Sequence, residues 1–152
     1  PHDELNPEDS AKIIIAHVID GISLGKKNKL PDRVIDFIRT HHGTSKVYFF
    51  YKKQIELNPN SNVKNFIYPG PKPFSKETSI VMMADSIEAA SKSLKEPSFE
   101  ILKEFVHRII NQQMDEGQFI NSNITFSEIE AVKKVLLKKL VNIYQLRIEY
   151  PI

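Results

Sequence analysis

The sequence predicts an all-α domain of about six helices over residues 1–152. Apolar residues recur at intervals of three and four in six successive segments. Proline, glycine and capping residues separate these segments, and no stretch of the sequence shows the period-two alternation of a half-buried strand. Because 152 residues is the length of one ordinary domain, we expect a single helical domain.

Composition narrows the function classes. The chain is 41 % hydrophobic and 26 % charged, which is typical of a globular protein, and its net charge of +2 argues against a dedicated binder of nucleic-acid polymers. Cysteine is absent, which excludes disulfides, zinc–thiolate sites and a thiol nucleophile, and fits a reducing cytoplasm. No apolar run approaches the roughly 18 residues of a membrane span. Since the chain begins at Pro1 without Met, we expect a piece of a longer protein.

The first helix is predicted to begin at Asn6-Pro7-Glu8-Asp9 and to end near Lys29. An N-cap residue, a proline and two acids are typical of a first turn. The residues at helical spacing in this segment are Ile13, Ile14, His17, Val18 and Leu24. Because His17 follows Ile13 by four residues, we expect it to point toward the buried face, where a lone histidine is more often a core residue than a ligand.

The second helix is predicted to begin at Pro31 and to run into His41-His42. Gly43 follows this pair and suits the left-handed residue that ends many helices. Imidazoles at a helix end can both face one pocket, and neutral histidine is the commonest metal ligand. The alternative is a pair of partly exposed histidines, favoured as cations near a helix C-terminus.

A third helix is expected from Ser45 to Leu57, followed by a loop over residues 58–73. The loop ends in Tyr68-Pro69-Gly70-Pro71-Lys72-Pro73, where three prolines and a glycine rule out a helix or a central strand. Long stiff loops are usually functional.

A fourth helix, capped by Ser75, is predicted from Lys76 to about Ser93. Asp85 lies in its middle, where aspartate is a poor helix former and costly to bury unpaired. One interpretation is that Asp85 faces water. The other is that it is buried against a cation, where small neighbouring residues leave room.

Two further helices complete the prediction. The fifth spans roughly Ser98 to Glu116 and ends at Gly117; its His107 is assigned no role in a site. The last helix ends at about Glu149. Two capping boxes fit its start, Thr125-x-x-Glu128 and Ser127-x-x-Glu130, and the sequence does not decide between them.

Four candidate ligands, His17, His41, His42 and Asp85, can meet only if three helices pack together. Imidazoles with a carboxylate suit Fe, Mn or Zn, and a pair of such metals can drive phosphodiester hydrolysis. Four ligands are too few for two metals, so the sequence alone predicts an incomplete site.

Several motifs in chain order resemble the HD domain of bacterial seven-transmembrane HD proteins, which are membrane-anchored cyclic di-AMP phosphodiesterases. The resemblance covers essentially the whole chain. The motifs are His17-Val18-Ile19-Asp20-Gly21, Arg39-Thr40-His41-His42-Gly43-Thr44, Tyr68-Pro69-Gly70-Pro71-Lys72-Pro73-x-Ser75-Lys76-Glu77, Met83-Ala84-Asp85-Ser86-Ile87-Glu88-Ala89 and Tyr144-x-x-Arg147-Ile148-Glu149-Tyr150-Pro151.

The resemblance implies a helical domain that binds two divalent transition metals, often iron or manganese, and cleaves cyclic di-AMP to linear pApA. Carried over, His17, His41, His42 and Asp85 are the metal ligands. The nucleophile is then a metal-bound water, and no side-chain nucleophile is needed. The partners implied are cyclic di-AMP and the membrane and sensor regions of a parent protein, with this domain on the cytoplasmic side.

The sequence departs from the family pattern at its beginning. The family also uses an upstream histidine and a His-Asp dyad, and His2-Asp3 lies too close to His17 to be that dyad. We therefore expect the N-terminal helices with those ligands to be missing, so that this chain binds one metal or none and is inactive alone. An apolar face exposed by that loss is expected to favour homo-oligomers.

The remaining roles concern the substrate. Lys72 and Lys76 are candidates for phosphate contact and Tyr68 for stacking on an adenine, with an ordinary surface loop as the alternative. Asp20 is a candidate partner for a ligand imidazole or a solvated helix residue. Two other functions stay open: an HD-type phosphohydrolase of other nucleotides, and a catalytically silent helical module for signalling or interaction.

Overall fold

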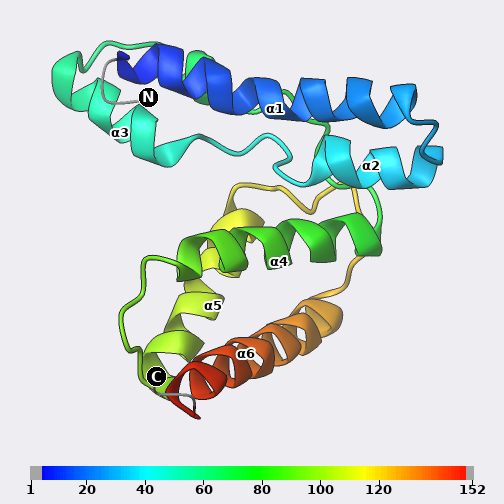
Figure 1. The fold of residues 1–152 in the computed structure, drawn as a ribbon, viewed down its shortest axis with the longest axis vertical. Coiled ribbons are helices and arrows are strands. Elements are labelled where there is room, and N and C mark those ends of the chain that lie inside the picture. Colours follow the sequence, from blue (N-terminus) through cyan, green and yellow to red (C-terminus); the bar gives the residue numbers. More distant parts are fainter. Residues whose placement is uncertain (1–4, 150–152) are drawn as a thin grey trace. The chain divides into compact units, whose positions relative to one another are not determined.

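The computed structural model describes residues 5–149, which form helices without any named strand in that range (Figure 1). The predicted all-α class is therefore confirmed. The elements are α1 (Pro7–Lys27), α2 (Asp32–Thr40), α3 (Tyr48–Leu57), the 3-10 helix η2 (Val63–Phe66), α4 (Lys76–Ser91), α5 (Phe99–Asp115) and α6 (Phe126–Glu149). His2-Asp3 and the residues after Glu149 lie outside the described range.

The helix ends differ from the predicted ones by a few residues. His41 and His42 follow α2 instead of ending it, and α3 begins at Tyr48 instead of Ser45. The predicted loop contains the short helix η2, which sequence periodicity cannot detect over four residues. The capping box of α6 is the one at Thr125, whose hydroxyl accepts a hydrogen bond from the Glu128 backbone N–H at 3.1 Å.

The chain divides into two compact units, one up to Lys72 and one from Pro73 onward. The first contains α1, α2, α3 and η2, and the second contains α4, α5 and α6. In the first unit α3 lies along the N-terminal half of α1 and α2 along its C-terminal half (Figure 1). The boundary falls inside the proline-rich loop, and the single-domain interpretation stays a prediction.

The buried face of α1 differs from the predicted one. Ala11 and Val18 are almost fully buried in the core of the first unit, whereas Ile13 and Leu24 are 54 % and 61 % exposed. His17 is exposed as well. The prediction that His17 shares a buried face with Ile13 was wrong, because α1 carries isoleucines on several sides and its periodicity does not mark one face.

The close approach of α2 to α1 depends on two glycines one turn apart in α1. A Cβ atom added at Gly21 meets the Ile38 Cγ2 methyl at 3.0 Å, and one added at Gly25 meets Ile35 Cγ1 at 3.3 Å. A larger side chain at either position therefore requires these isoleucines to shift. This contact sets the distance between His17, on α1, and His41, directly after α2.

The second unit has its own core where α5 packs against α4 and α6. This core is an apolar cluster with few polar members. Its most buried residues are Met82, Met83, Ile87, Leu102, Val106 and Ile110. Lys133 of α6 is buried too, and its ammonium donates to Asn111 of α5 at 2.7 Å.

Among the residues that the structure describes, no helix combines the length and the apolar character needed to cross a bilayer.

We predict that Gly21→Val destabilises the chain by about 1–3 kcal/mol, because the added methyls overpack the contact with Ile38. Ser23→Val is the matched control: the same residue type enters the same helix at an exposed position, and its effect stays within about 0.5 kcal/mol. Urea unfolding of both variants measures the difference. Equal stability of the two variants contradicts the proposed role of Gly21.

Candidate metal centre

The pair His41-His42 lies in the turn that stops α2. His41 caps the helix through its backbone N–H, which donates to the Phe37 carbonyl at 3.1 Å. Gly43 then adopts a left-handed conformation with φ of 51°, as predicted. Because the helix stops here, adjacent residues are freed from the roughly 100° spacing of a helix and can serve the same site.

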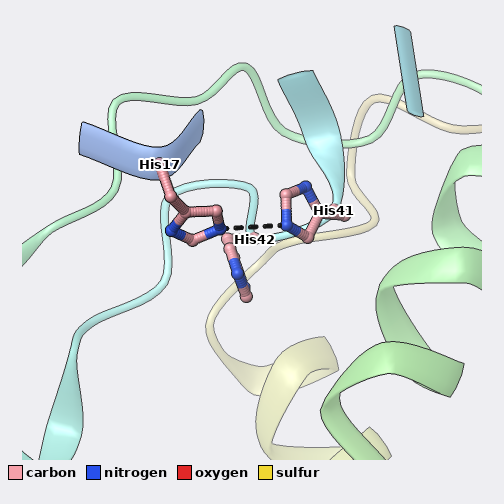
Figure 2. A group of neighbouring side chains, drawn as sticks. All are labelled: His17, His41 and His42. Carbon is pink, nitrogen blue, oxygen red and sulfur yellow. Dashed lines mark hydrogen bonds between the residues drawn. The ribbon is translucent and has the colours of Figure 1, made fainter. Parts of the chain in front are cut away.

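The third histidine comes from α1. His17 lies one turn before Gly21, which packs against Ile38 of α2, and its ring contacts those of the other two. One ring nitrogen from each of His17, His41 and His42 lies within 4.8 Å of the others. Figure 2 shows the rings of His17 and His41 facing each other, with the His42 ring beside them.

Backbone carbonyls orient two of these rings. His17 Nδ1 contacts the carbonyl of Ile14, and His41 Nδ1 contacts the carbonyl of Ile38 at 2.7 Å. Since a carbonyl oxygen only accepts, each Nδ1 carries the proton and each Nε2 carries a lone pair. Metal-ligating histidines usually donate their second ring N–H in this way.

The two Nε2 atoms face each other at 3.3 Å (Figure 2). With both Nδ1 atoms protonated, two acceptors point at one another, which is unfavourable unless a cation lies at that position or one ring gains a second proton. Three converging imidazole nitrogens without a cysteine suit Fe, Mn or Zn. The residues present therefore fit a transition metal.

The third imidazole is held by ring stacking. The rings of His42 and Tyr68 are nearly parallel, 17° apart, with centroids at 4.2 Å, and His41 lies against His42 with centroids at 4.0 Å. Burial, together with the neighbouring imidazoles of His41 and His17, lowers the pKa of His42 from 6.5 to about 3. His42 is therefore neutral at physiological pH, the form that binds metals.

The remaining predicted residues come from the proline-rich loop and from α4. Asp85 is half-buried in α4 of the second unit, and its role as a ligand stays a prediction. Lys72 lies half-buried in the proline-rich loop. Lys76, at the start of α4, makes an ion pair with Glu128 at 3.0 Å, so contact with a phosphate requires it to exchange that partner.

The predicted partner of a ligand imidazole needs a correction for His17. The group at His17 Nδ1 is the Ile14 carbonyl and not the carboxylate of Asp20, which is exposed. The reason is geometric, because the carbonyl three residues earlier in the same helix lies within reach of an imidazole Nδ1. A role for Asp20 beside another ligand stays a prediction.

Two features of the site were missed. The carbonyls of Ile14 and Ile38 leave no sequence signal, since every helical residue has one. Tyr68 was predicted as an adenine platform, yet it is only 7 % exposed and stacks on His42. The run of prolines after it marked a rigid loop but not which histidine the loop contacts.

A helical fold with three histidines whose ring nitrogens lie close together defines a candidate metal-binding domain. No family model matches the chain. It is 42 % identical over 151 residues to the cyclic-di-AMP phosphodiesterase PgpH of Bacillus subtilis (strain 168), and 40 % identical to that of Listeria monocytogenes serotype 1/2a (strain 10403S). Each match covers 99 % of this chain and 21 % of the relative, so the chain spans about a fifth of their length.

The fold is also that of a solved relative. The crystal structure of the L. monocytogenes phosphodiesterase PgpH HD domain in complex with cyclic-di-AMP matches with a TM-score of 0.91 at 40 % identity, over 95 % of this chain and 68 % of that one. The chain belongs to the family of PgpH HD domains.

We predict that the metal-free chain loses stability as the pH falls below about 6.5, in part through His42. The native imidazole stays neutral down to about pH 3, whereas a histidine in the unfolded chain takes up a proton near pH 6.5. Between these values the unfolded state binds more protons, so the free energy of unfolding falls with falling pH.

Urea unfolding between pH 4 and 7.5 measures this dependence. His42→Gln flattens it, and His107→Gln, outside the cluster, leaves it as in the unsubstituted chain. Identical pH profiles for the His42 variant and the unsubstituted chain contradict the prediction.

Proposed function

We propose that this domain is the hydrolytic part of a longer protein that cleaves cyclic di-AMP to linear pApA in a metal-dependent reaction. The observation that carries the proposal is the convergence of His17, His41 and His42 on one point. The relatives support the choice of substrate, because both are named cyclic-di-AMP phosphodiesterases and the solved one holds cyclic-di-AMP.

Part of the metal site is assigned to residues of this chain. His17, His41 and His42 would hold a metal through ring nitrogens, and Asp85 would add a carboxylate. The proposal includes a second divalent metal, with iron or manganese as the metals, and further ligands upstream of this chain. When bound, such metals polarise a phosphoryl oxygen and lower the pKa of water.

The chain's own residues prepare the site. The carbonyls of Ile14 and Ile38 fix the tautomers of His17 and His41, so that both present a lone pair at Nε2. Tyr68 covers one face of His42 and excludes water from it. Lys72 is assigned to a phosphate of the substrate, because the proline-rich loop restricts where its backbone can go.

The first experiment combines metal analysis with cyclic di-AMP hydrolysis, on this chain and on a version extended upstream. We expect the extended protein to carry about two metals and to release pApA, and this chain to do neither. His41→Ala in the extended protein lowers hydrolysis more than about 100-fold, since outer-shell partners alone are worth 10–100-fold. His107→Ala is the matched control and retains activity.

Two outcomes contradict the proposal in different ways. An extended protein that binds no transition metal indicates a silent helical module. One that binds metal and cleaves another nucleotide, but not cyclic di-AMP, indicates a different HD-type phosphohydrolase.

A separate prediction concerns Lys72. In the extended protein Lys72→Ala raises KM for cyclic di-AMP by about 10-fold or more, because a hydrogen bond to a charged group contributes about 1.5–3 kcal/mol. Lys64→Ala, an exposed lysine of η2, is the control with an unchanged KM. Steady-state kinetics measures both, and an equal KM in the two variants contradicts the role of Lys72.

A further inference from the structure

Backbone hydrogen bonds hold Tyr68 in place, in addition to the contacts that its ring makes. Lys46 and Ile67 form an isolated antiparallel bridge, and beside it the Tyr68 N–H donates to the Ser45 carbonyl at 2.9 Å. This short pairing begins three residues after His42. The backbone that follows His42 is thereby tied to the backbone that carries Tyr68.

The pairing also decides where the ring points. Side chains alternate along an extended segment, so Phe66 and Tyr68 point to the same side while Ile67 points to the other. Phe66 is fully buried and Tyr68 is 7 % exposed, and both belong to the core cluster that contains Val18. The Tyr68 ring is therefore anchored in the core of the first unit and cannot turn freely.

This anchored ring contacts two of the three histidines. It stacks on His42, with planes 17° apart and centroids at 4.2 Å, and the His17 ring meets it edge-on with centroids at 6.0 Å. The lone pair of an imidazole nitrogen lies in the plane of its ring. A ring held parallel to Tyr68 can direct that lone pair only along the Tyr68 face.

We propose that Tyr68 is a positioning residue of the metal centre: its ring fixes the plane of His42 and so aims the His42 nitrogen at the point where His17 and His41 converge. This inference rests on the proposed function, because it takes His42 to be a metal ligand. It replaces the adenine-stacking role, since the stacked face of Tyr68 is covered by His42.

The different contacts made by the three imidazoles support this assignment. His17 and His41 are oriented through their Nδ1 atoms by carbonyls of their own helices. His42 lies beyond α2, and an aromatic face supplied from the loop before α4 stacks on its ring. The stacking contact itself is made by the Tyr68 ring.

The test separates the ring from the hydroxyl and from general packing. Tyr68→Phe keeps the ring, and Tyr68→Leu removes it. Tyr51→Leu is the matched control, because Tyr51 packs on Phe66 in the same cluster, with ring centroids at 5.6 Å. Thermal unfolding of each variant records the stability lost.

The first readout is the NMR spectrum of the metal-free chain. The carbon-bound ring protons of His42, assigned with His42→Gln, are shifted upfield by the stacked ring. We expect Tyr68→Phe and Tyr51→Leu to keep this shift and Tyr68→Leu to lose it. An upfield shift that persists in Tyr68→Leu overturns the proposal.

The second readout is the affinity for cobalt(II), followed by visible absorption in the protein extended upstream. Tyr68→Leu weakens binding by about 10–100-fold, the usual effect of losing a group that orients a ligand, while Tyr68→Phe binds as the unsubstituted protein does. Equal weakening in Tyr68→Leu and Tyr51→Leu shows a loss of packing and overturns the proposal, as does equal weakening in Tyr68→Phe.

If the unsubstituted protein binds no cobalt, the proposed metal-dependent function fails, and the positioning role fails with it even where the NMR shift shows that the stack exists. If cobalt binds as expected but cyclic di-AMP is not cleaved, the substrate assignment alone fails and the role of Tyr68 stands.

Discussion

The contact between α1 and α2 through Gly21 and Gly25 is the constraint on which the metal centre depends. Without side chains at these positions, Ile35 and Ile38 approach the axis of α1 directly. The same Ile38 provides the carbonyl that orients His41. The packing of α1 against α2 and the orientation of His17 and His41 therefore depend on the same two glycines, one turn apart.

The second constraint is the short backbone pairing between residues 45–47 and 66–68. It carries Tyr68 back onto His42, and it brings Gly70, with φ of 79°, within 3.1 Å of a Thr44 methyl when a Cβ is added. Only glycine tolerates both that conformation and that approach. A chain classified as all-helical thus relies on a few residues of extended backbone for one of its three imidazoles.

Much of the first unit could be predicted from the sequence, because its signals are local. The Asn6 cap and the helix stop at Gly43 act over a few residues, so the sequence shows them directly. Helix packing decides which histidines meet. The residue types indicated the candidate ligands, and the motif resemblance indicated which of them share a site. The exposed face of α1 was mispredicted because isoleucines occur on several sides of that helix. The stacking of Tyr68 on His42 was missed because it arises from pairing between segments about twenty residues apart.

The three histidines of the cluster differ in their exposure to solvent. His42 lies half-buried beneath Tyr68, whereas His17 is exposed on α1. His42 is held by the core of the first unit, whereas the His17 ring is the more accessible of the two. Within the part of the chain that the structure describes, a substitution on the exposed side of α1 near His17 therefore changes the surroundings of the most exposed imidazole of this cluster.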